Sequence, residues 1–209
     1  MCGINGIYGL ENLTTSPVEI IQKMNNALAH RGPDAEGVAK YENLVLGHRR
    51  LSIIDLNQES NQPMYGLNKR YAIVYNGEIY NYQEIKSQLN DYPFSTKSDT
   101  EVIIAAYHKW GVNCVSRFNG MWAFAIWDEL KKELFISRDR LGIKPLYYFK
   151  KDKSIIFSSE LRALLASTVI PKKLNTAALT DYFRYQTVHA PETIIKDVFM
   201  LMPGHNMII

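Results

Sequence analysis

The second residue of the chain combines two groups that could do chemistry together. Cys2 carries the most nucleophilic of the ordinary side chains, and removal of Met1 would give it a free α-amine. This amine has a reference pKa of roughly 7.7 to 8.0 and accepts a proton near neutrality. One residue would then supply both the nucleophile and its general base. The alternative is an inert cysteine, and a retained Met1 would replace the amine with an amide, which is no base.

Asn76 and Gly77 could stabilise developing negative charge. An Asn side-chain amide and a neighbouring backbone N–H are donors of the kind that hold an oxyanion, and the loss of one such donor costs about 2.7 to 4 kcal/mol in hydrolases. Asn-Gly between apolar runs is also the strongest short-range signal for a hairpin turn. The two residues alone leave both interpretations open.

Five segments, of which the first and fourth contain these residues, occur in this order: Cys2–Ile7, His30–Asp34, Arg50–Ile54, Tyr75–Tyr80 and Ser98–Glu101. As a set they resemble the class II glutamine amidotransferases, whose N-terminal-nucleophile domain hydrolyses glutamine. Three downstream segments narrow the resemblance to the glutaminase domain of glutamine-hydrolysing asparagine synthetases and extend it over nearly the whole chain. They are Phe118–Ala125, Arg138–Tyr147 and Ser159–Leu164.

The resemblance implies a role for each site residue. L-glutamine would be hydrolysed to L-glutamate and ammonia through a thioester on Cys2, with Asn76 and Gly77 holding the oxyanion. Arg50 would bind the α-carboxylate, for which a guanidinium offers two parallel hydrogen bonds, and Asp99 would bind the α-ammonium. The remaining substrate-binding residues would be Leu51, Ser52, Ile53, Ile54 and Glu78.

Two other segments receive secondary roles from the resemblance. The loop His30–Asp34 would lie beside the glutamine site and help to close it. The loop Arg138–Tyr147 would help to form the face toward a synthetase domain, through which ammonia passes. Nothing in the chemistry of this second loop is expected to reach glutamine.

The resemblance also predicts domain content and partners. Residues 1–209 would form one class II glutamine amidotransferase domain without its C-terminal synthetase domain, because the pyrophosphate-binding Ser-Gly-Gly-x-Asp-Ser motif does not occur in the sequence. ATP and Mg are expected only for that missing domain, and no cofactor for this one. The expected partners are L-glutamine and a synthetase domain or subunit, with a homodimer as a further option.

Two alternative functions remain open at this stage. One is an amidotransferase domain whose ammonia goes to another acceptor, such as a sugar or a cell-envelope precursor. The other is a catalytically silent glutamine-binding module, which would result if Met1 is retained.

Composition and charge exclude several other classes of function. The chain has 24 Lys and Arg against 21 Asp and Glu, a net charge of +3 with interspersed signs, and hence no basic stripe for nucleic acid or an anionic membrane. Its longest apolar runs, such as Met121–Trp127, are far shorter than the roughly 20 residues of a membrane span, so we expect a cytoplasmic protein. Two cysteines and scattered histidines predict neither a disulfide framework nor a metal site.

The helices and strands that must position these residues are predicted in blocks along the chain. Strands and helices do not strictly alternate, which favours an α+β fold with antiparallel sheets. The resemblance specifies it as the four-layer α/β/β/α sandwich of N-terminal-nucleophile hydrolases. Helices are expected at 16–30, 82–89, 99–110, 161–166 and 176–185, with a capping box at Ser98–Glu101. Strands are expected at Gly3–Leu10, within Gly37–Leu56, at Arg70–Tyr75, as a run of four between 121 and 158, and as strand-turn-strand at Asp197–Ile209.

Overall fold

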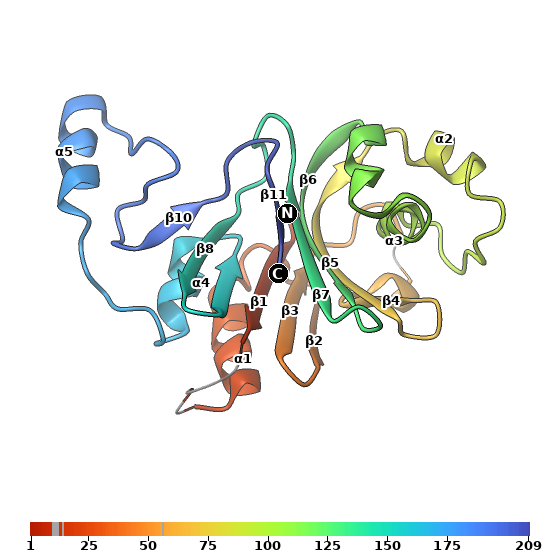
Figure 1. The fold of residues 1–209 in the computed structure, drawn as a ribbon, viewed down its shortest axis with the longest axis horizontal. Coiled ribbons are helices and arrows are strands. Elements are labelled where there is room, and N and C mark those ends of the chain that lie inside the picture. The colour runs from red at the N-terminus through yellow and green to blue at the C-terminus, as the bar shows by residue number, and fades with distance from the viewer. Residues whose placement is uncertain (10–12, 14, 56) are drawn as a thin grey trace.

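Two antiparallel sheets form the centre of the computed structural model, which describes residues 1–9, 13, 15–55 and 57–209 (Figure 1). The six-stranded sheet consists, in spatial order, of β10 (Val198–Met200), β8 (Tyr147–Lys151), β9 (Ser154–Ser158), β1 (Gly3–Tyr8), β3 (Leu44–Arg50) and β2 (Ala35–Lys40). The five-stranded sheet consists of β11 (Asn206–Ile208), β7 (Glu133–Arg138), β6 (Gly120–Asp128), β5 (Tyr71–Ile79) and β4 (Met64–Gly66).

Helices cover the outer faces of both sheets. α1 (Pro17–Ala27) and α4 (Leu161–Ala166) pack on the six-stranded sheet, whereas α3 (Asp99–Trp110) and the short α2 (Tyr82–Ser87) pack on the five-stranded sheet. This arrangement confirms the predicted α/β/β/α layers. α5 (Thr176–Tyr185) lies at the left edge of Figure 1, away from the two sheets. The 3₁₀ turns η1 (Gln58–Ser60) and η2 (Gly111–Arg117) complete the elements.

Alternation along the strands explains the layers. In β5, Ala72 and Val74 pack into the cluster between the sheets, while Ile73 and Tyr75 face α3. Successive side chains of a strand point to opposite faces, so a strand that is apolar on both faces must be covered on both sides. The small residues face the other sheet and the large ones face the helices.

Several boundaries differ from the expectations. α1 ends at Ala27 rather than near His30. At its start, Ser16 makes no side-chain cap hydrogen bond, so of the two predicted start signals only Pro17 at the first helical position is confirmed. Ser98 caps α3 through the Thr100 amide, but the predicted capping box is not formed. The Glu101 carboxylate instead accepts hydrogen bonds from Ser95 and Thr96. The predicted strand ends Leu10 and Leu56 lie outside the described residues.

Pairing between strands corrects two further expectations. The run of four strands is two hairpins, because β6 and β7 pair in one sheet while β8 and β9 pair in the other. Likewise, β10 and β11 flank the turn at Pro203 but belong to different sheets. Sequence spacing shows that strands follow one another, but only packing decides which sheet they join.

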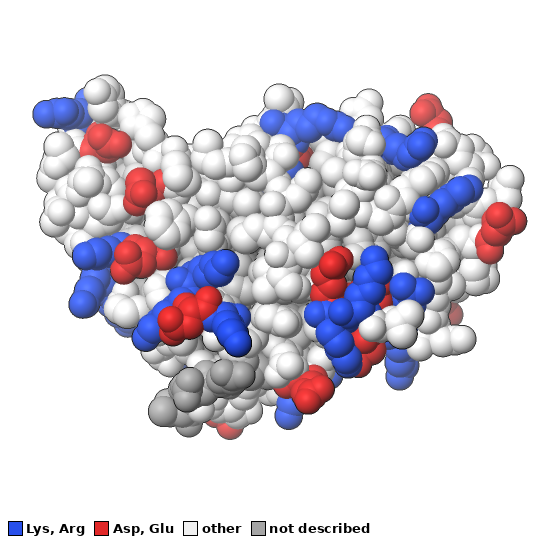
Figure 2. Space-filling model, viewed as in Figure 1, with Lys and Arg blue, Asp and Glu red and all other residues white. Residues whose placement is uncertain are grey.

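The surface and the helix lengths agree with the composition. On the face shown in Figure 2, basic and acidic side chains are interspersed, and neither sign forms a continuous stripe. Within the described ranges, the helices are too short or too polar to cross a membrane.

Candidate active site

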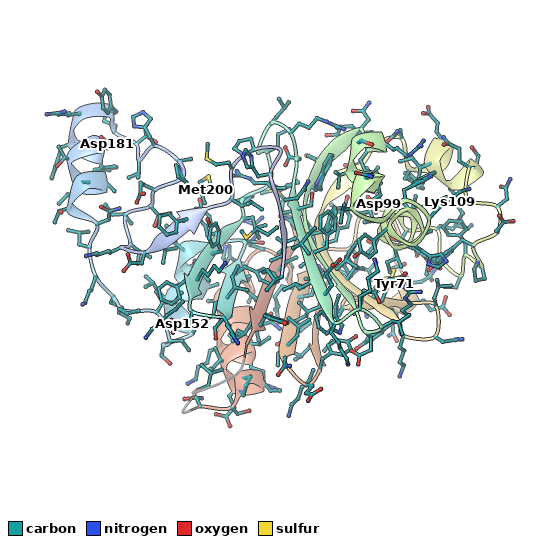
Figure 3. All side chains as sticks on the ribbon, viewed as in Figure 1. Tyr71, Asp99, Lys109, Asp152, Asp181 and Met200 are labelled. Atoms are coloured by element: carbon teal, nitrogen blue, oxygen red, sulfur yellow. The ribbon has the colours of Figure 1, made fainter. Side chains whose placement is uncertain are left out.

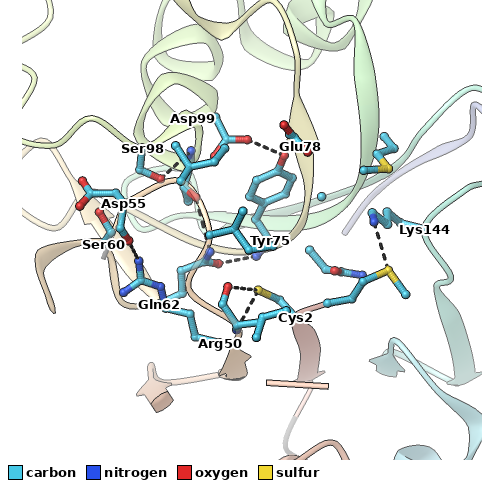
Figure 4. A pocket seen from close by; sticks show the side chains of 18 residues that line it. Cys2, Arg50, Asp55, Ser60, Gln62, Tyr75, Glu78, Ser98, Asp99 and Lys144 are labelled. Atoms are coloured by element: carbon cyan, nitrogen blue, oxygen red, sulfur yellow. Dashed lines mark hydrogen bonds between the residues drawn. The ribbon is translucent and has the colours of Figure 1, made fainter. Parts of the chain in front are cut away.

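A small cavity of about 170 Å³ opens where the ends of β1 and β3 meet β5 and the N-terminus of α3 (Figure 4). This volume is well below the roughly 300 Å³ at which pockets for drug-sized ligands begin. All of the predicted site residues except Ser52 line it: Cys2, Arg50, Leu51, Ile53, Ile54, Asn76, Gly77, Glu78 and Asp99. Residues from distant parts of the sequence therefore meet in a space that suits a metabolite of amino-acid size.

Cys2 lies just before β1 and is held against the end of β3. Its Sγ accepts a hydrogen bond from the Leu51 amide at 3.4 Å and lies 3.6 Å from the Leu51 carbonyl oxygen. Burial raises the pKa of the Cys2 thiol, although the Leu51 amide and the positive charges of the N-terminus, Arg50 and Arg31 oppose the rise. The protonated thiol is favoured at rest, so an attack by this sulfur calls for a base.

The His30–Asp34 loop reaches the backbone of Cys2. Arg31 is largely buried, and its Nε donates to the Cys2 carbonyl oxygen at 2.8 Å. Its Nη1 forms an ion pair with Glu160 at 2.9 Å, and Glu160 also contacts His30. Asp34 accepts a hydrogen bond from the Ser52 amide. This loop therefore braces both Cys2 and the 51–54 segment, while Ser52 itself lies outside the cavity lining.

Asn76 and Gly77 are not in a turn. They lie within β5, where they pair with Ala123 and Trp122 of β6, so the hairpin interpretation is wrong. Asn76 follows Val74 on the face toward the other sheet, is 1% exposed, and its Nδ2 has no hydrogen-bond partner among the described residues. A buried donor without a partner is costly, and this donor borders the cavity that also contains Cys2.

Gly77 lies so close to strand β6 that there is no room for a side chain. A Cβ at this position would lie 2.2 Å from the Met121 carbonyl oxygen of β6. Any side chain would therefore force the two strands apart. The neighbouring strand therefore requires glycine at this place.

His48 is a site residue that the sequence analysis missed. It is fully buried in β3, and its Nε2 donates to the Tyr75 carbonyl oxygen of the other sheet at 3.1 Å. A carbonyl can only accept, so the proton is on Nε2. Desolvation lowers the pKa of His48 to about 4 and keeps the ring neutral. The bond fixes the peptide that leads into Asn76, and a lone histidine gave no signal for this role.

Asp99 is the first residue of α3 and points its carboxylate at β5. Its Oδ2 accepts hydrogen bonds from the Tyr75 hydroxyl at 2.8 Å and the Ile79 amide at 3.0 Å. Figure 3 shows Asp99 where α3 meets the five-stranded sheet. Burial raises the pKa of Asp99, and the two donors counteract part of the rise. The pocket therefore contains a buried carboxylate that a positively charged group would stabilise.

Arg50 lines the cavity, but its guanidinium is already bonded. Nη1 donates to the Asn57 carbonyl oxygen at 3.0 Å and to Asn61 Oδ1 at 2.7 Å, while Nη2 donates to the Asp55 carbonyl oxygen. Asp55, Asn57 and Asn61 therefore occupy donors that the resemblance assigns to a carboxylate. A carboxylate would have to share or replace these bonds.

Gln62 is another residue that the sequence analysis missed. Its Oε1 accepts a hydrogen bond from the Tyr75 amide at 2.6 Å, and its Nε2 donates to Thr100 Oγ1 at 3.4 Å. The side chain thus joins β5 to the first turn of α3 at the cavity wall. An isolated glutamine in a loop carries no pattern that predicts this contact.

The Arg138–Tyr147 loop, of which no residue was expected to reach glutamine, does contribute Lys144 to the cavity lining. The Asp139 carboxylate accepts the amides of Leu141, Ile143 and Lys144, which curls the loop back. The Arg138 guanidinium binds carbonyl oxygens of the same loop, including that of Lys144 at 2.7 Å. Hydrogen bonds within the loop, which residue types alone do not predict, bring Lys144 to Cys2.

No group of three or more His, Cys, Asp or Glu in the described ranges is arranged to hold a metal ion. The groups that surround the cavity are a thiol, amides, carboxylates and cations. Such a set can grip a zwitterion at both ends and attack a carbonyl carbon between them.

Comparisons with known proteins agree with this geometry. A family model described as a glutamine amidotransferase domain matches residues 1–209. A putative glutamine-hydrolysing asparagine synthetase 2 of Methanocaldococcus jannaschii is 44% identical over the whole chain, which spans 44% of that protein. Asparagine synthetase B of Escherichia coli is 39% identical over 79% of the chain, which spans 30% of that protein. The chain thus spans less than half the length of these relatives.

Solved structures share the fold. Glutamine phosphoribosylpyrophosphate amidotransferase from B. subtilis has a TM-score of 0.68 at 21% identity, with 99% of this chain and 48% of that chain covered. At this identity the similarity shows the fold alone. It supports the two-sheet sandwich with outer helices.

Proposed function

Because this chain belongs to the glutamine amidotransferase domain family, we propose that it hydrolyses L-glutamine to L-glutamate and ammonia through a thioester on Cys2. The observation that carries this proposal is the meeting of Cys2, Asn76 and Asp99 around one cavity of about 170 Å³. The three residues come from the chain start, the middle of β5 and the start of α3.

The reaction begins once Met1 has been removed. The α-amine of Cys2 takes the thiol proton, and Sγ attacks the side-chain carbonyl carbon of glutamine. Asn76 Nδ2 and the Gly77 amide hold the oxyanion of the tetrahedral intermediate. The intermediate collapses to the thioester, and the amine proton goes to the departing nitrogen, which leaves as ammonia. Water, deprotonated by the same amine, then releases glutamate. All of these groups belong to the chain, so the step is proposed to proceed without a cofactor.

Substrate is held at its two charged ends. Asp99 binds the α-ammonium and Arg50 binds the α-carboxylate, while residues 51–54 and Glu78 belong to the substrate pocket around them. Arg50 Nη1 is held by Asn57 and Asn61 in the unliganded chain, so binding exchanges these neutral acceptors for a carboxylate. Charge-assisted hydrogen bonds are roughly twice as strong as neutral ones, which favours the exchange.

The test of this proposal compares matched cysteine variants. Mature protein, with the loss of Met1 verified by intact mass, is expected to form glutamate and ammonia in equal amounts. Cys2→Ala is expected to form neither, while Cys114→Ala, at a buried cysteine outside the cavity, keeps the activity. Mature protein that binds glutamine but releases no ammonia would instead support a silent binding module.

The fate of the ammonia is a separate part of the proposal. The relatives are named as asparagine synthetases, so we assign the ammonia to an ATP- and Mg-dependent synthetase domain or subunit that makes asparagine. The exposed apolar side chains of Leu141 and Ile143 suit a face covered by such a partner. Asparagine formation from glutamine, aspartate and ATP by the protein purified from its own cells tests this assignment.

A different acceptor is the second candidate. The protein named amidase chry2 of Gibberella zeae is 34% identical over the whole chain, which spans 32% of that protein. The same domain thus occurs in a relative that is not named as an asparagine synthetase. Amide formation on a sugar or cell-envelope precursor, without asparagine, would favour this candidate.

A further inference from the structure

Lys144 is a buried cation at the cavity to which the mechanism above gives no role. It is 5% exposed and lies in the loop after β7, and its Nζ is 3.2 Å from the Met1 Sδ (Figure 4). Removal of Met1, on which the proposed function depends, would take this thioether away. Cys2, whose α-amine would then be free, lines the same cavity as Lys144.

Among the residues that the structure describes, no carboxylate forms an ion pair with the ammonium group of Lys144. The neighbouring Asp139 carboxylate accepts the backbone amide of Lys144 and other amides of the loop, so it serves the loop fold. A buried charge without a close partner is costly. Its retention at a catalytic cavity calls for a functional explanation.

We propose that Lys144 is a positioning residue that keeps the α-amine of Cys2 in its free-base form by placing a second positive charge beside it. This inference rests on the proposed function, in which the amine is the general base. A neighbouring like charge disfavours the protonated form of an amine. The effect would arise only after Met1 has been removed, because a peptide nitrogen does not titrate.

Other charged groups around the cavity also affect the electrostatic potential at the Cys2 amine. Arg31 binds the Cys2 carbonyl oxygen, and Arg50 faces the thiol from β3, so both add to the positive potential. Glu78 from β5 and Asp139 oppose it. Burial lowers the pKa of Lys144, with a contribution from Arg31, while Asp139, Cys2 and Glu78 raise it. The carboxylates thus help Lys144 to stay protonated while the amine loses its proton.

The experiment is the pH dependence of kcat/KM for glutamine in mature protein. In Lys144→Met, the acid limb is expected to move to higher pH by about half a unit to one unit. The rate would fall about 3- to 10-fold on that limb and return to the wild-type value at high pH. Lys144→Arg keeps the charge and should restore the wild-type limb. Lys150→Met, at an exposed lysine of β8, serves as the matched control.

Two results would overturn the inference. One is a Lys144→Met profile with an unmoved acid limb, and the other is an equal loss at every pH, which indicates a structural role. A second measurement does not depend on the variants: in ¹³C-cysteine-labelled mature wild type, the Cys2 amine should titrate below its usual range of roughly 7.7 to 8.0. Titration within or above that range also overturns the inference. Wild type without glutaminase activity contradicts the proposed function instead, and the amine titration still tests Lys144.

Discussion

Cys2 and Asn76 face the same cavity from different sheets, but they are held in different ways. Cys2 precedes the first strand, and its contacts are the Leu51 backbone and the Arg31 side chain. Asn76 is in the middle of β5, paired with β6 and fully buried. An N-terminal base must be a chain end, and chain ends are weakly held unless other groups brace them. The oxyanion donors carry no such requirement and can be fixed within the core.

This difference shows that the two sheets contribute different parts of the proposed site. The five-stranded sheet presents the proposed oxyanion donors, and α3, which packs on it, presents Asp99; none of these groups needs to rearrange when charge develops. The six-stranded sheet presents the proposed nucleophile, Cys2, whose proposed role depends on removal of Met1 and whose backbone is braced by Arg31. His48 is the buried link between the two, because it lies in β3 and binds the Tyr75 carbonyl oxygen of β5.

The largest effect is expected for Asn76→Ala, which removes a proposed oxyanion donor of β5. We expect kcat to fall about 100- to 1,000-fold because one oxyanion donor is lost. The melting temperature should hardly change, since Asn76 Nδ2 has no partner to lose among the described residues. Steady-state kinetics and thermal unfolding measure the two effects. Asn113→Ala, at an exposed position of η2, is the control, and a loss of less than about threefold in Asn76→Ala would contradict the oxyanion role.

His48, which links the two sheets, predicts that the free energy of unfolding depends on pH. His48 has a pKa of about 4 when folded, against 6.5 for an ordinary histidine. Between these values the unfolded chain binds a proton that the folded chain refuses, so stability falls as pH decreases from 6.5 to 4. The contribution amounts to about 3 kcal/mol. Denaturant unfolding of wild type and His48→Gln should show this difference in pH dependence.

A second histidine, His205, provides the control for this measurement. His205 is exposed, and His205→Gln should leave the pH dependence of unfolding unchanged. The same slope in wild type and His48→Gln would show that His48 is not the group that titrates.

Asp99→Asn tests whether α3, which packs on the five-stranded sheet, also holds the substrate. The variant keeps an acceptor for Tyr75 and Ile79 but loses the charge for the α-ammonium, so kcat/KM should fall about 10- to 100-fold, mainly through KM. Stability at neutral pH should be unchanged or higher, because burial disfavours the Asp99 carboxylate. Glutaramate, which lacks the α-amine, should be discriminated against by wild type and much less by the variant. Asp91→Asn, at an exposed position, is the control, and unchanged discrimination in Asp99→Asn would reject this role.

Much of the fold could be predicted from local signals. Alternating and continuous apolar runs located most strands, and α3, α4 and α5 were predicted with the bounds that the structure has. The errors arose where partners are distant in sequence. Asn76-Gly77 has the composition of a turn, but pairing with β6 extends β5 through it. Sheet membership of the later strands was missed for the same reason.

The residue types by themselves determined the available chemistry: a cysteine that can become an N-terminus, an amide donor, a carboxylate and a guanidinium. Tertiary structure decided which groups share the cavity: it added Gln62 and Lys144 to the lining and left Ser52 outside. It also placed His48, which is not part of the lining, against the Tyr75 carbonyl oxygen. Reactivity is a property of a side chain and can be recognised in a sequence. Proximity depends on strand pairing, buried hydrogen bonds and loop curvature, which arise from contacts between residues far apart in the chain.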